Sequence, residues 1–268
     1  DLKTIAEYYV DSGYATGYIG KWHLDGGWPD PWKKKKKKGM PLNLGYVPPQ
    51  NRQGWQDWLG YEKSHQYFNV AKINEQGKAV KIPGYDWEPE WMTDEALRFI
   101  RQKERENKPW MYYLAYGPPH LPNECPQNYL DMYPPEHITL PPDVERDLPD
   151  ALKTELRKQL QIYYAQVTAI DVQVGRLLKE LKKSGIDRNT IIFYTSDHGD
   201  YLGSHYTERG SNRLRGKWLP YYSDMIIPCI MRWPGNIEPG EVSDTPISNI
   251  DFVPTLLELG GLEVPDYM

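Results

Sequence analysis

Cysteine is scarce in this sequence of 268 residues: only Cys125 and Cys229 occur, far apart and outside any Cys-x-x-Cys pattern. This excludes a zinc knuckle and a disulfide framework. No apolar run is long enough to cross a membrane as a helix, so we expect no transmembrane segment. The sequence starts at Asp1 on an amphipathic pattern, without methionine or a signal peptide, and we therefore expect it to be part of a longer protein.

An excess of positive charge is also lacking. The formal net charge is -5 and the sequence pI is about 5.7, so no general basic field is present to attract nucleic acid, and we expect no nucleic-acid partner. The exception is Lys33 to Lys38, six consecutive lysines that repel one another. We expect them to form a solvated surface loop and assign them no function.

Phenylalanine is rare as well, with four residues, whereas there are 10 Trp and 21 Tyr. Rings that carry a polar group suit partly wet clefts and sugar-stacking surfaces as well as protein cores. Tryptophans close to the polar motifs described below favour a carbohydrate ligand, although packing explains them equally well. These residues are Trp28, Trp32, Trp55, Trp58, Trp87 and Trp91.

The apolar patterns predict helices that alternate with strands. Helices are predicted at 2–10, 93–105, 151–184 and 250–259, and strands at 16–19, 110–116, 190–195 and 225–231. Long loops with short strands near 67–70 and 79–82 are predicted between 25 and 89, and 123–150 is Pro-rich and irregular. This order predicts an α/β sandwich with a mostly parallel central sheet flanked by helices, in which ligand sites gather at the carboxyl ends of the strands.

Three polar clusters follow predicted strands directly. They are Gly20-Lys21-Trp22-His23, Gly117-Pro118-Pro119-His120 and Ser196-Asp197-His198-Gly199. A single lysine or histidine after a strand is more often structural or merely exposed. Because strand ends converge in a parallel sheet, however, we expect the three clusters to meet in one crevice.

The side chains in these clusters suit an anion and a cation. Lys21 and His23 alternate along a segment predicted to be extended, so they would share one face and could approach the same anion. Asp197 and His198 offer an oxygen and a nitrogen to a divalent cation, with Gly199 relieving steric crowding, although a capped turn is the alternative. We do not expect the nearby Asp200 and His205 to ligate the cation. Asp200 could cap the following turn or helix, and His205 could support a ligand from behind or be an ordinary loop histidine.

These motifs resemble the sulfatase family, the formylglycine-dependent hydrolases of the alkaline-phosphatase-like superfamily. Gly13-Tyr14-Ala15-Thr16 followed by Gly20-Lys21-Trp22-His23-Leu24 resembles the second sulfatase signature. The remaining matches follow in the family's order and cover most of the chain. They are Gly117 to His120, Thr195 to Gly199, Gly216-Lys217 with Tyr221, Ile227-Pro228, Arg232 to Gly235, and Asp251 to Thr255.

The resemblance implies a role for four catalytic residues. Lys21 and His23 would hold the sulfate and the hydroxyl of the nucleophile, while Lys217 and His120 would bind the sulfate and assist departure of the leaving group. These residue types suit the reaction, because cations offset charge on the nonbridging oxygens and a proton donor serves the leaving alkoxide.

The resemblance also implies a metal and a modified nucleophile. Asp197 and His198 would ligate a divalent metal, calcium as the first expectation and Mg²⁺ or Mn²⁺ as alternatives, since His198 stands where many relatives have Asn. The family's nucleophile is a formylglycine made in a Cys-x-Pro-x-Arg or Ser-x-Pro-x-Arg motif, and no such motif occurs here. Cys125 lacks the required spacing and arginine, and Cys229 lies in an apolar segment as an expected core residue.

We therefore expect residues 1–268 to be a partial sulfatase catalytic domain, without the upstream nucleophile region, its metal-binding aspartates and the C-terminal subdomain. The function implied is hydrolysis of a small-molecule or carbohydrate sulfate ester, and the 268 residues alone should have negligible turnover. The alternatives are a phosphoester or phosphonate hydrolase of the same superfamily and a non-catalytic module that binds sulfated glycans. The family is typical of periplasmic, secreted or lysosomal locations, and the sequence does not indicate an oligomeric state.

Overall fold

The computed structural model describes residues 2–24, 45–122, 124–206, 214–217 and 219–268, so Lys33 to Lys38, Trp28 and Trp32 lie outside the described residues. The chain forms two compact units. The first comprises Asp1–Pro122 with Pro246–Met268, and the second comprises Asn123–Thr245.

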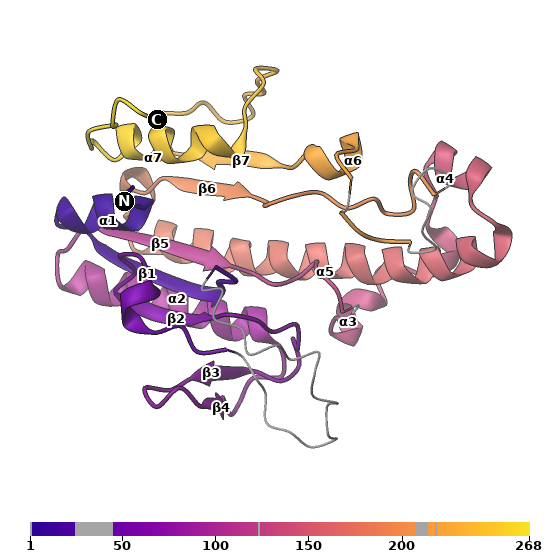
Figure 1. The fold of residues 1–268 in the computed structure, drawn as a ribbon, viewed down its shortest axis with the longest axis horizontal. Coiled ribbons are helices and arrows are strands. Elements are labelled where there is room, and N and C mark those ends of the chain that lie inside the picture. Colours follow the sequence, from indigo (N-terminus) through magenta and orange to yellow (C-terminus); the bar gives the residue numbers. More distant parts are fainter. Residues whose placement is uncertain (1, 25–44, 123, 207–213, 218) are drawn as a thin grey trace. The chain divides into compact units, whose positions relative to one another are not determined.

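A parallel three-stranded sheet forms the centre of the first unit (Figure 1). It contains β1 (Ala15–Lys21), β2 (Asp57–Tyr61) and β5 (Trp110–Ala115) in the order β2-β1-β5. Tyr18 lies opposite Trp58 on one side and Tyr113 on the other, and its ring stacks on both at centroid distances of 5.0 and 5.3 Å. Such cross-strand ring pairs stabilise a sheet. Because all three strands are parallel, their carboxyl ends lie at the same edge.

Helices and a short hairpin surround this sheet. They are α1 (Ile5–Asp11), η2 (Pro49–Asn51), β3 (Ala71–Ile73), β4 (Ala79–Lys81), α2 (Glu88–Arg105), η5 (Asn249–Asp251) and α7 (Phe252–Leu259). α1 begins at a capping box on Thr4, and Tyr9 of this helix donates a hydrogen bond to the carbonyl of Leu256 in α7. α2 buries Trp91 and Met92 against Ile19 of β1, which closes one face of the sheet with apolar side chains.

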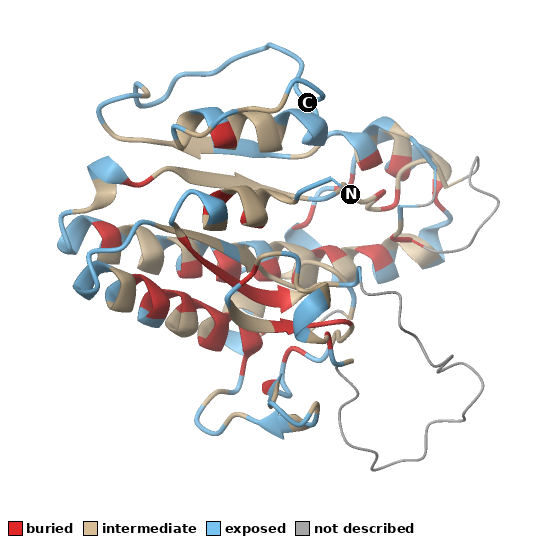
Figure 2. Ribbon diagram, turned by 60° about the vertical axis from the view of Figure 1, so that its left-hand side comes forward, coloured by how far each residue is buried: buried red, intermediate tan, exposed pale blue. Residues whose placement is uncertain are grey.

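The second unit is built on α5 (Asp150–Lys183). Its other elements are α3 (Gln127–Leu130), η3 (Pro135–His137), α4 (Pro142–Asp147), η4 (Asp187–Asn189), β6 (Ile192–Thr195), α6 (Tyr222–Met225) and β7 (Cys229–Arg232), with β6 antiparallel to β7. Buried residues recur at helical spacing along α5, including Leu156, Leu160, Ala165 and Ala169 (Figure 2). Leu156 and Leu160 pack against Val144 of α4, so the long helix organises the core of this unit.

The α/β class and the parallel central sheet are confirmed, whereas several details differ from the sequence prediction. The short strand predicted near 67–70 lies instead at β3 (Ala71–Ile73). β2 was not predicted, because Asp57 and Gly60 are poor strand formers, but Trp58 packs on Tyr18. The strand predicted at 225–231 is wrong in its first half, since α6 ends at Met225 and Pro228 has no N–H for a strand ladder. α2 begins before the predicted residue 93, with proline and acidic residues in its first turn.

The tryptophans suggested for sugar stacking pack inside the first unit. Trp55, Trp87 and Trp91 are 7%, 1% and 2% exposed, and Trp58 is half-buried on the sheet beside Tyr18. A side chain that is nearly inaccessible to water offers no face to a ligand. The packing explanation therefore holds for these four residues.

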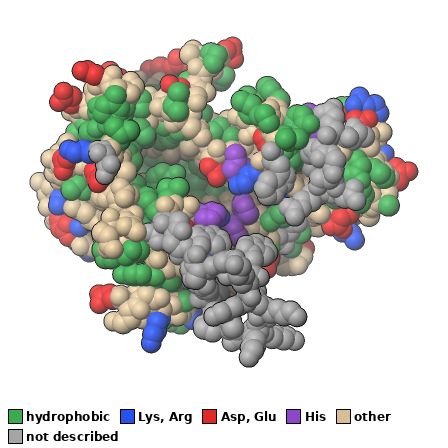
Figure 3. All heavy atoms as spheres, viewed as in Figure 1, with side chains coloured by type: hydrophobic (Ala, Val, Ile, Leu, Met, Phe, Trp, Pro, Cys, Tyr) green, Lys and Arg blue, Asp and Glu red, His purple; other side chains and the backbone are tan. Residues whose placement is uncertain are grey.

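The visible face of the described residues in Figure 3 is mixed in charge. On the face shown in Figure 3, Lys and Arg side chains are scattered among Asp and Glu and do not gather in one patch. In the described part of the chain, no helix combines the length and the apolar composition needed to span a bilayer.

One carboxyl group in the core of the first unit has an unusual environment. Glu88, in the first turn of α2, is 4% exposed, and Tyr61 donates a hydrogen bond of 3.2 Å to its Oε2 atom. Burial raises the pKa of Glu88 from 4.5 to about 7, and the hydrogen bond from Tyr61 opposes this change only in part. Glu88 therefore keeps its proton in the folded state over a pH range in which the unfolded chain has lost it.

This pKa predicts that Glu88→Gln raises the free energy of unfolding by an amount that depends on pH. The glutamine side chain cannot ionise and still accepts the hydrogen bond from Tyr61. The contribution of Glu88 to stability is fully present below pH 4.5, falls as the pH rises to about 7, and stays low above that value. The difference between these two pKa values, at about 1.4 kcal/mol per pH unit, predicts that the variant unfolds with a free energy on the order of 3 kcal/mol higher above pH 7 and equal near pH 4. Urea denaturation across this range measures the difference, and a pH-independent difference would contradict the prediction.

Candidate active site

Lys21 ends β1 at the edge of the sheet where the parallel strands terminate. Its ammonium group lies 3.3 Å from Nε2 of His65. The preceding Gly20 has a φ of 113°, and a Cβ atom there would meet the carbonyl oxygen of Ala115 on β5 and lie 2.9 Å from Met92 Cε. Glycine at this position therefore lets β1 approach β5 closely enough to carry Lys21 to the edge.

His23 does not continue the strand. β1 ends at Lys21, and His23 has a φ of 57° in the left-handed region with an exposed side chain. The expectation that residues 21–23 form an extended segment is therefore wrong, and so is the alternation argument that places both side chains on one face. The catalytic role of His23 stays a prediction from the resemblance.

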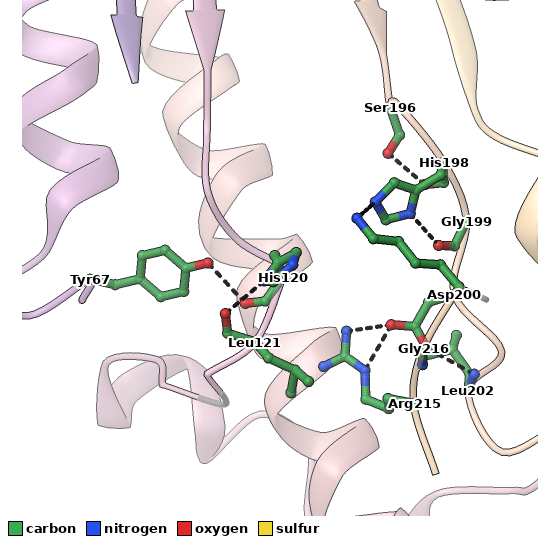
Figure 4. Close-up of polar contacts among 11 residues, drawn as sticks. Tyr67, His120, Leu121, Ser196, His198, Gly199, Asp200, Leu202, Arg215 and Gly216 are labelled. Atoms are coloured by element: carbon green, nitrogen blue, oxygen red, sulfur yellow. Dashed lines mark hydrogen bonds and ion pairs between the residues drawn. The ribbon is translucent and has the colours of Figure 1, made fainter. Parts of the chain in front are cut away.

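His120 follows β5, and the ring of His65 stacks on it. The two imidazole centroids are 4.1 Å apart with an interplanar angle of 5°. Nδ1 of His120 lies 2.7 Å from the carbonyl oxygen of Leu121, and because a carbonyl only accepts, Nδ1 carries a hydrogen (Figure 4). The other ring nitrogen, Nε2, is then the atom that can take up and release a second proton.

His65 was not identified from the sequence. It lies between β2 and β3 in a segment without helical or strand periodicity, and it follows no predicted strand. No local signal distinguishes it from an ordinary loop histidine. The structure of the first unit thus brings together Lys21, His65 and His120, of which the sequence analysis singled out the first and the last.

In the second unit, Asp197 and His198 follow β6, as predicted. Nε2 of His198 lies 3.3 Å from Oδ2 of Asp197, and Nδ1 donates to the carbonyl of Gly199 at 2.6 Å (Figure 4). The ammonium group of Lys217 contacts the same Nε2 atom. Asp197, His198 and Lys217 therefore lie together in this unit. The convergence of the three sequence clusters in one crevice stays a prediction.

The donor chemistry at His198 fits a metal ligand. With its Nδ1 hydrogen held by a carbonyl, the ring presents the Nε2 lone pair, which is the usual arrangement of a ligating histidine. The Asp197 carboxylate and the Lys217 ammonium group meet at that nitrogen, so the position already accommodates a positive charge. Among the described residues, however, no group of three or more His, Cys, Asp or Glu side chains could hold a metal. Asp197 and His198 supply two ligands and not a complete shell.

Asp200 joins the turn at Asp197 and His198 to the segment that carries Lys217. Its Oδ2 atom accepts from Nε and Nη2 of Arg215 at 3.1 and 2.9 Å, and its Oδ1 atom accepts from the backbone N–H groups of Leu202 and Gly216 (Figure 4). Arg215 is buried, with its guanidinium over the ring of Tyr163 at 4.8 Å. Asp200 thus caps the turn, which is the role that the sequence suggested for it.

Gly199 and Asp224 fix the other side of this turn. The N–H of Gly199 donates to the carbonyl of Asp224 at 2.7 Å, and a Cβ atom at Gly199 would meet the carbonyl oxygen of Ser223. Burial raises the pKa of the Asp224 carboxyl group, while a hydrogen bond from Tyr201 and the charges of His198 and Lys217 act in the opposite direction. Asp224 was not predicted from sequence, because it lies directly before the apolar stretch 225–231 and follows no predicted strand.

The remaining candidates show packing environments. The ring of His205 stacks on that of Tyr221 at 4.0 Å and 6°. Cys125 is buried, and burial raises the pKa of its thiol to about 12, which disfavours the thiolate that a nucleophile requires. Cys229 is exposed on β7, so its predicted place in the core is wrong, and desolvation raises the pKa of its thiol as well. Neither thiol is activated.

A comparison with known protein families decides the assignment. The model of the family described as Sulfatase matches residues 1–262. The chain belongs to the sulfatase family. An ulvan-active sulfatase of Formosa agariphila is 30% identical over 264 residues, which are 98% of this chain and 47% of that protein. An endo-4-O-sulfatase of Bacteroides thetaiotaomicron is 28% identical over 98% of this chain and 51% of that protein. This sulfatase chain thus spans about half the length of the curated relatives it matches.

Solved structures agree on the fold. A Bacteroides fragilis protein assigned as a sulfatase superposes with a TM-score of 0.81 at 27% identity, covering 99% of this chain and 57% of that one. A phosphonate monoester hydrolase of Silicibacter pomeroyi superposes with a TM-score of 0.70 at 22% identity, covering 99% and 59%. The likeness to the phosphonate hydrolase concerns the fold alone. The sulfatase family is generally metal-dependent, which agrees with the donor chemistry of Asp197 and His198.

Proposed function

We propose that the protein carrying this chain hydrolyses sulfate esters. The observation that carries the proposal is the His120 ring, whose Nδ1 hydrogen is held by the carbonyl of Leu121 so that Nε2 can give a proton to a leaving alkoxide. Lys21 also supports the proposal, because its ammonium group contacts His65, whose ring stacks on His120. The proposed catalytic residues are Lys21, His23, His120 and Lys217, and the proposed metal ligands are Asp197 and His198.

The chemistry of these side chains suits sulfate transfer. In the proposed reaction, an oxygen of the nucleophile bonds to sulfur while the sulfur–oxygen bond to the alcohol breaks. The electron pair of the broken bond stays on the alkoxide oxygen, and His120 supplies the proton that neutralises it. Lys21 and Lys217 offset the negative charge on the nonbridging sulfate oxygens. A divalent ion held by Asp197 and His198, calcium in our proposal, would add positive charge beside the sulfate.

We further propose that the nucleophile is a formylglycine outside the 268 residues. The sequence contains no Cys-x-Pro-x-Arg or Ser-x-Pro-x-Arg motif, and both of its thiols have pKa values raised by burial. Residues 1–268 would then be the part of a catalytic domain that contributes leaving-group and sulfate-binding side chains, and they would not turn over by themselves.

The proposed substrate is a sulfated carbohydrate. The matched relatives are named for activity on ulvan and for endo-4-O-sulfatase activity. A further solved structure, with a TM-score of 0.76 at 22% identity, was obtained in complex with its substrate D-glucosamine-2-N,6-O-disulfate. Names of relatives do not fix the sugar or the position of the sulfate in this protein, so the proposal stops at the chemical class.

The test is sulfate release by the intact protein, co-expressed with a formylglycine-generating enzyme. We expect metal-dependent multiple turnover on a generic aryl sulfate and on sulfated oligosaccharides, and negligible turnover by residues 1–268 alone. Mass spectrometry of the intact protein should detect formylglycine. Faster hydrolysis of phosphonate monoesters would favour the phosphonate hydrolase instead, and tight binding of sulfated glycans without turnover would favour a binding module.

A further inference from the structure

We propose that His65 is a positioning residue for sulfate-ester cleavage, which orients Lys21 through its Nε2 atom and His120 through its ring. This inference rests on the proposed function. It concerns a histidine that neither the sequence motifs nor the family assignment singled out, and all three side chains lie in the first unit.

The contact with Lys21 defines the state of the His65 ring. An ammonium group donates hydrogen bonds and cannot accept one, so the 3.3 Å contact between Lys21 Nζ and His65 Nε2 requires a lone pair on Nε2. His65 is then neutral, with its hydrogen on Nδ1. The backbone of Lys21 is fixed as well, because its carbonyl accepts from the hydroxyl of Tyr18 at 2.5 Å. Together the two bonds restrict where the ammonium group can lie.

The contact with His120 restricts the direction in which that ring points. Its face lies on the His65 ring, 4.1 Å away and 5° from parallel, and its Nδ1 atom is held by the carbonyl of Leu121. A tilt of the His120 ring would break the stacking, and a 180° flip would break the bond to Leu121, so Nε2 keeps one direction. A neutral ring is also the right neighbour for a proton donor, because two adjacent imidazolium rings would repel each other.

The segment that carries His65 is anchored to the same structure. Tyr67, two residues further on, is fully buried and donates a hydrogen bond of 2.9 Å to the backbone carbonyl of His120. The carbonyl of Tyr67 accepts from the N–H of Glu88 at the start of α2. His65 therefore lies on a segment fixed to α2 and to the His120 strand end, as positioning to within fractions of an ångström requires.

Two variants of the intact protein separate the two contacts. His65→Gln keeps an acceptor near the position of Nε2 but has no ring, whereas His65→Phe keeps the ring and has no acceptor. We expect each to lower kcat/KM by about 10- to 100-fold. For the glutamine variant, the loss should increase with the pKa of the leaving group, because the orientation of His120 is affected. For the phenylalanine variant, the loss should be equal for all leaving groups and accompany a raised KM, because Lys21 is affected.

The matched controls are His137→Gln and His137→Phe, since His137 is an exposed histidine on η3 of the other unit. Both should retain the parent activity. Imidazole nitrogen NMR of the intact protein provides a readout independent of turnover and should show His65 neutral with its hydrogen on Nδ1. Parent-like kinetics of both His65 variants in an active protein, or a hydrogen on Nε2 of His65, would overturn the inference. Absence of any sulfatase activity in the parent would instead refute the proposed function.

Discussion

Replacing His120 by glutamine is expected to lower kcat of the intact protein by about 10²- to 10⁴-fold for sulfate esters of alcohols, which are poor leaving groups. The reason is which ring nitrogen of His120 carries the fixed hydrogen. The carbonyl of Leu121 fixes the hydrogen on Nδ1, which leaves Nε2 to deliver the proton that an alkoxide needs. A glutamine side chain fills similar space and forms hydrogen bonds but cannot transfer a proton at neutral pH. Steady-state kinetics on a series of sulfate esters measures the effect.

The leaving group supplies the internal control for this variant. An acidic phenol leaves an aryl sulfate as the phenolate and needs no proton. His120→Gln should therefore retain most of its activity on such esters. His137→Gln, at an exposed position in the other unit, should behave as the parent on every ester. An equal loss on good and poor leaving groups would show that His120 binds the sulfate and does not donate the proton.

Asp200→Ala is expected to destabilise the second unit by about 3–5 kcal/mol. The variant leaves the guanidinium of Arg215, whose side chain is 3% exposed, without its carboxylate partner. It also removes the acceptor of the N–H groups of Leu202 and Gly216. A buried charge that loses its carboxylate is far more costly than a lost surface contact. Urea denaturation followed by the signal of the second unit measures the change.

An exposed ion pair of the same unit provides the comparison. Asp147 accepts two hydrogen bonds from Arg146 at 2.7 Å, which is better geometry than that of the Asp200 pair, but Arg146 is largely in water. We expect Asp147→Ala to change the stability little, because solvent screens the pair. If the two alanine variants were equally stable, the burial of Arg215 would not have the energetic importance given to it here.

The strand-end logic of the sequence correctly placed most of the candidate site. Lys21 ends β1, and His120 and Asp197 follow β5 and β6, because short polar motifs after apolar runs mark the carboxyl ends of strands. The long helix α5 was also predicted almost to the residue, since its apolar spacing persists over many turns.

The parts that could not be predicted depend on tertiary contacts. His65 contacts Lys21 across 44 positions of the chain from a segment that Tyr67 bonds to His120, and Asp200 binds Arg215 across 15 positions. Cys229 looked like a core residue from its apolar neighbours, yet one-dimensional patterns do not show which strand has a covered face. The backbone of His23 has a left-handed φ and is not extended, which no alternation pattern reveals.

The two glycines beside the candidate site have a consequence for how such sites are mapped. Gly20 and Gly199 carry no functional group, yet each lies against a carbonyl oxygen of a neighbouring segment, Ala115 or Ser223, where any side chain would collide. In a survey of inactive mutants, substitutions there would be as frequent as those at Lys21 and Asp197. Loss of activity alone therefore cannot distinguish a residue that contacts the substrate from one whose missing side chain allows its neighbour to do so.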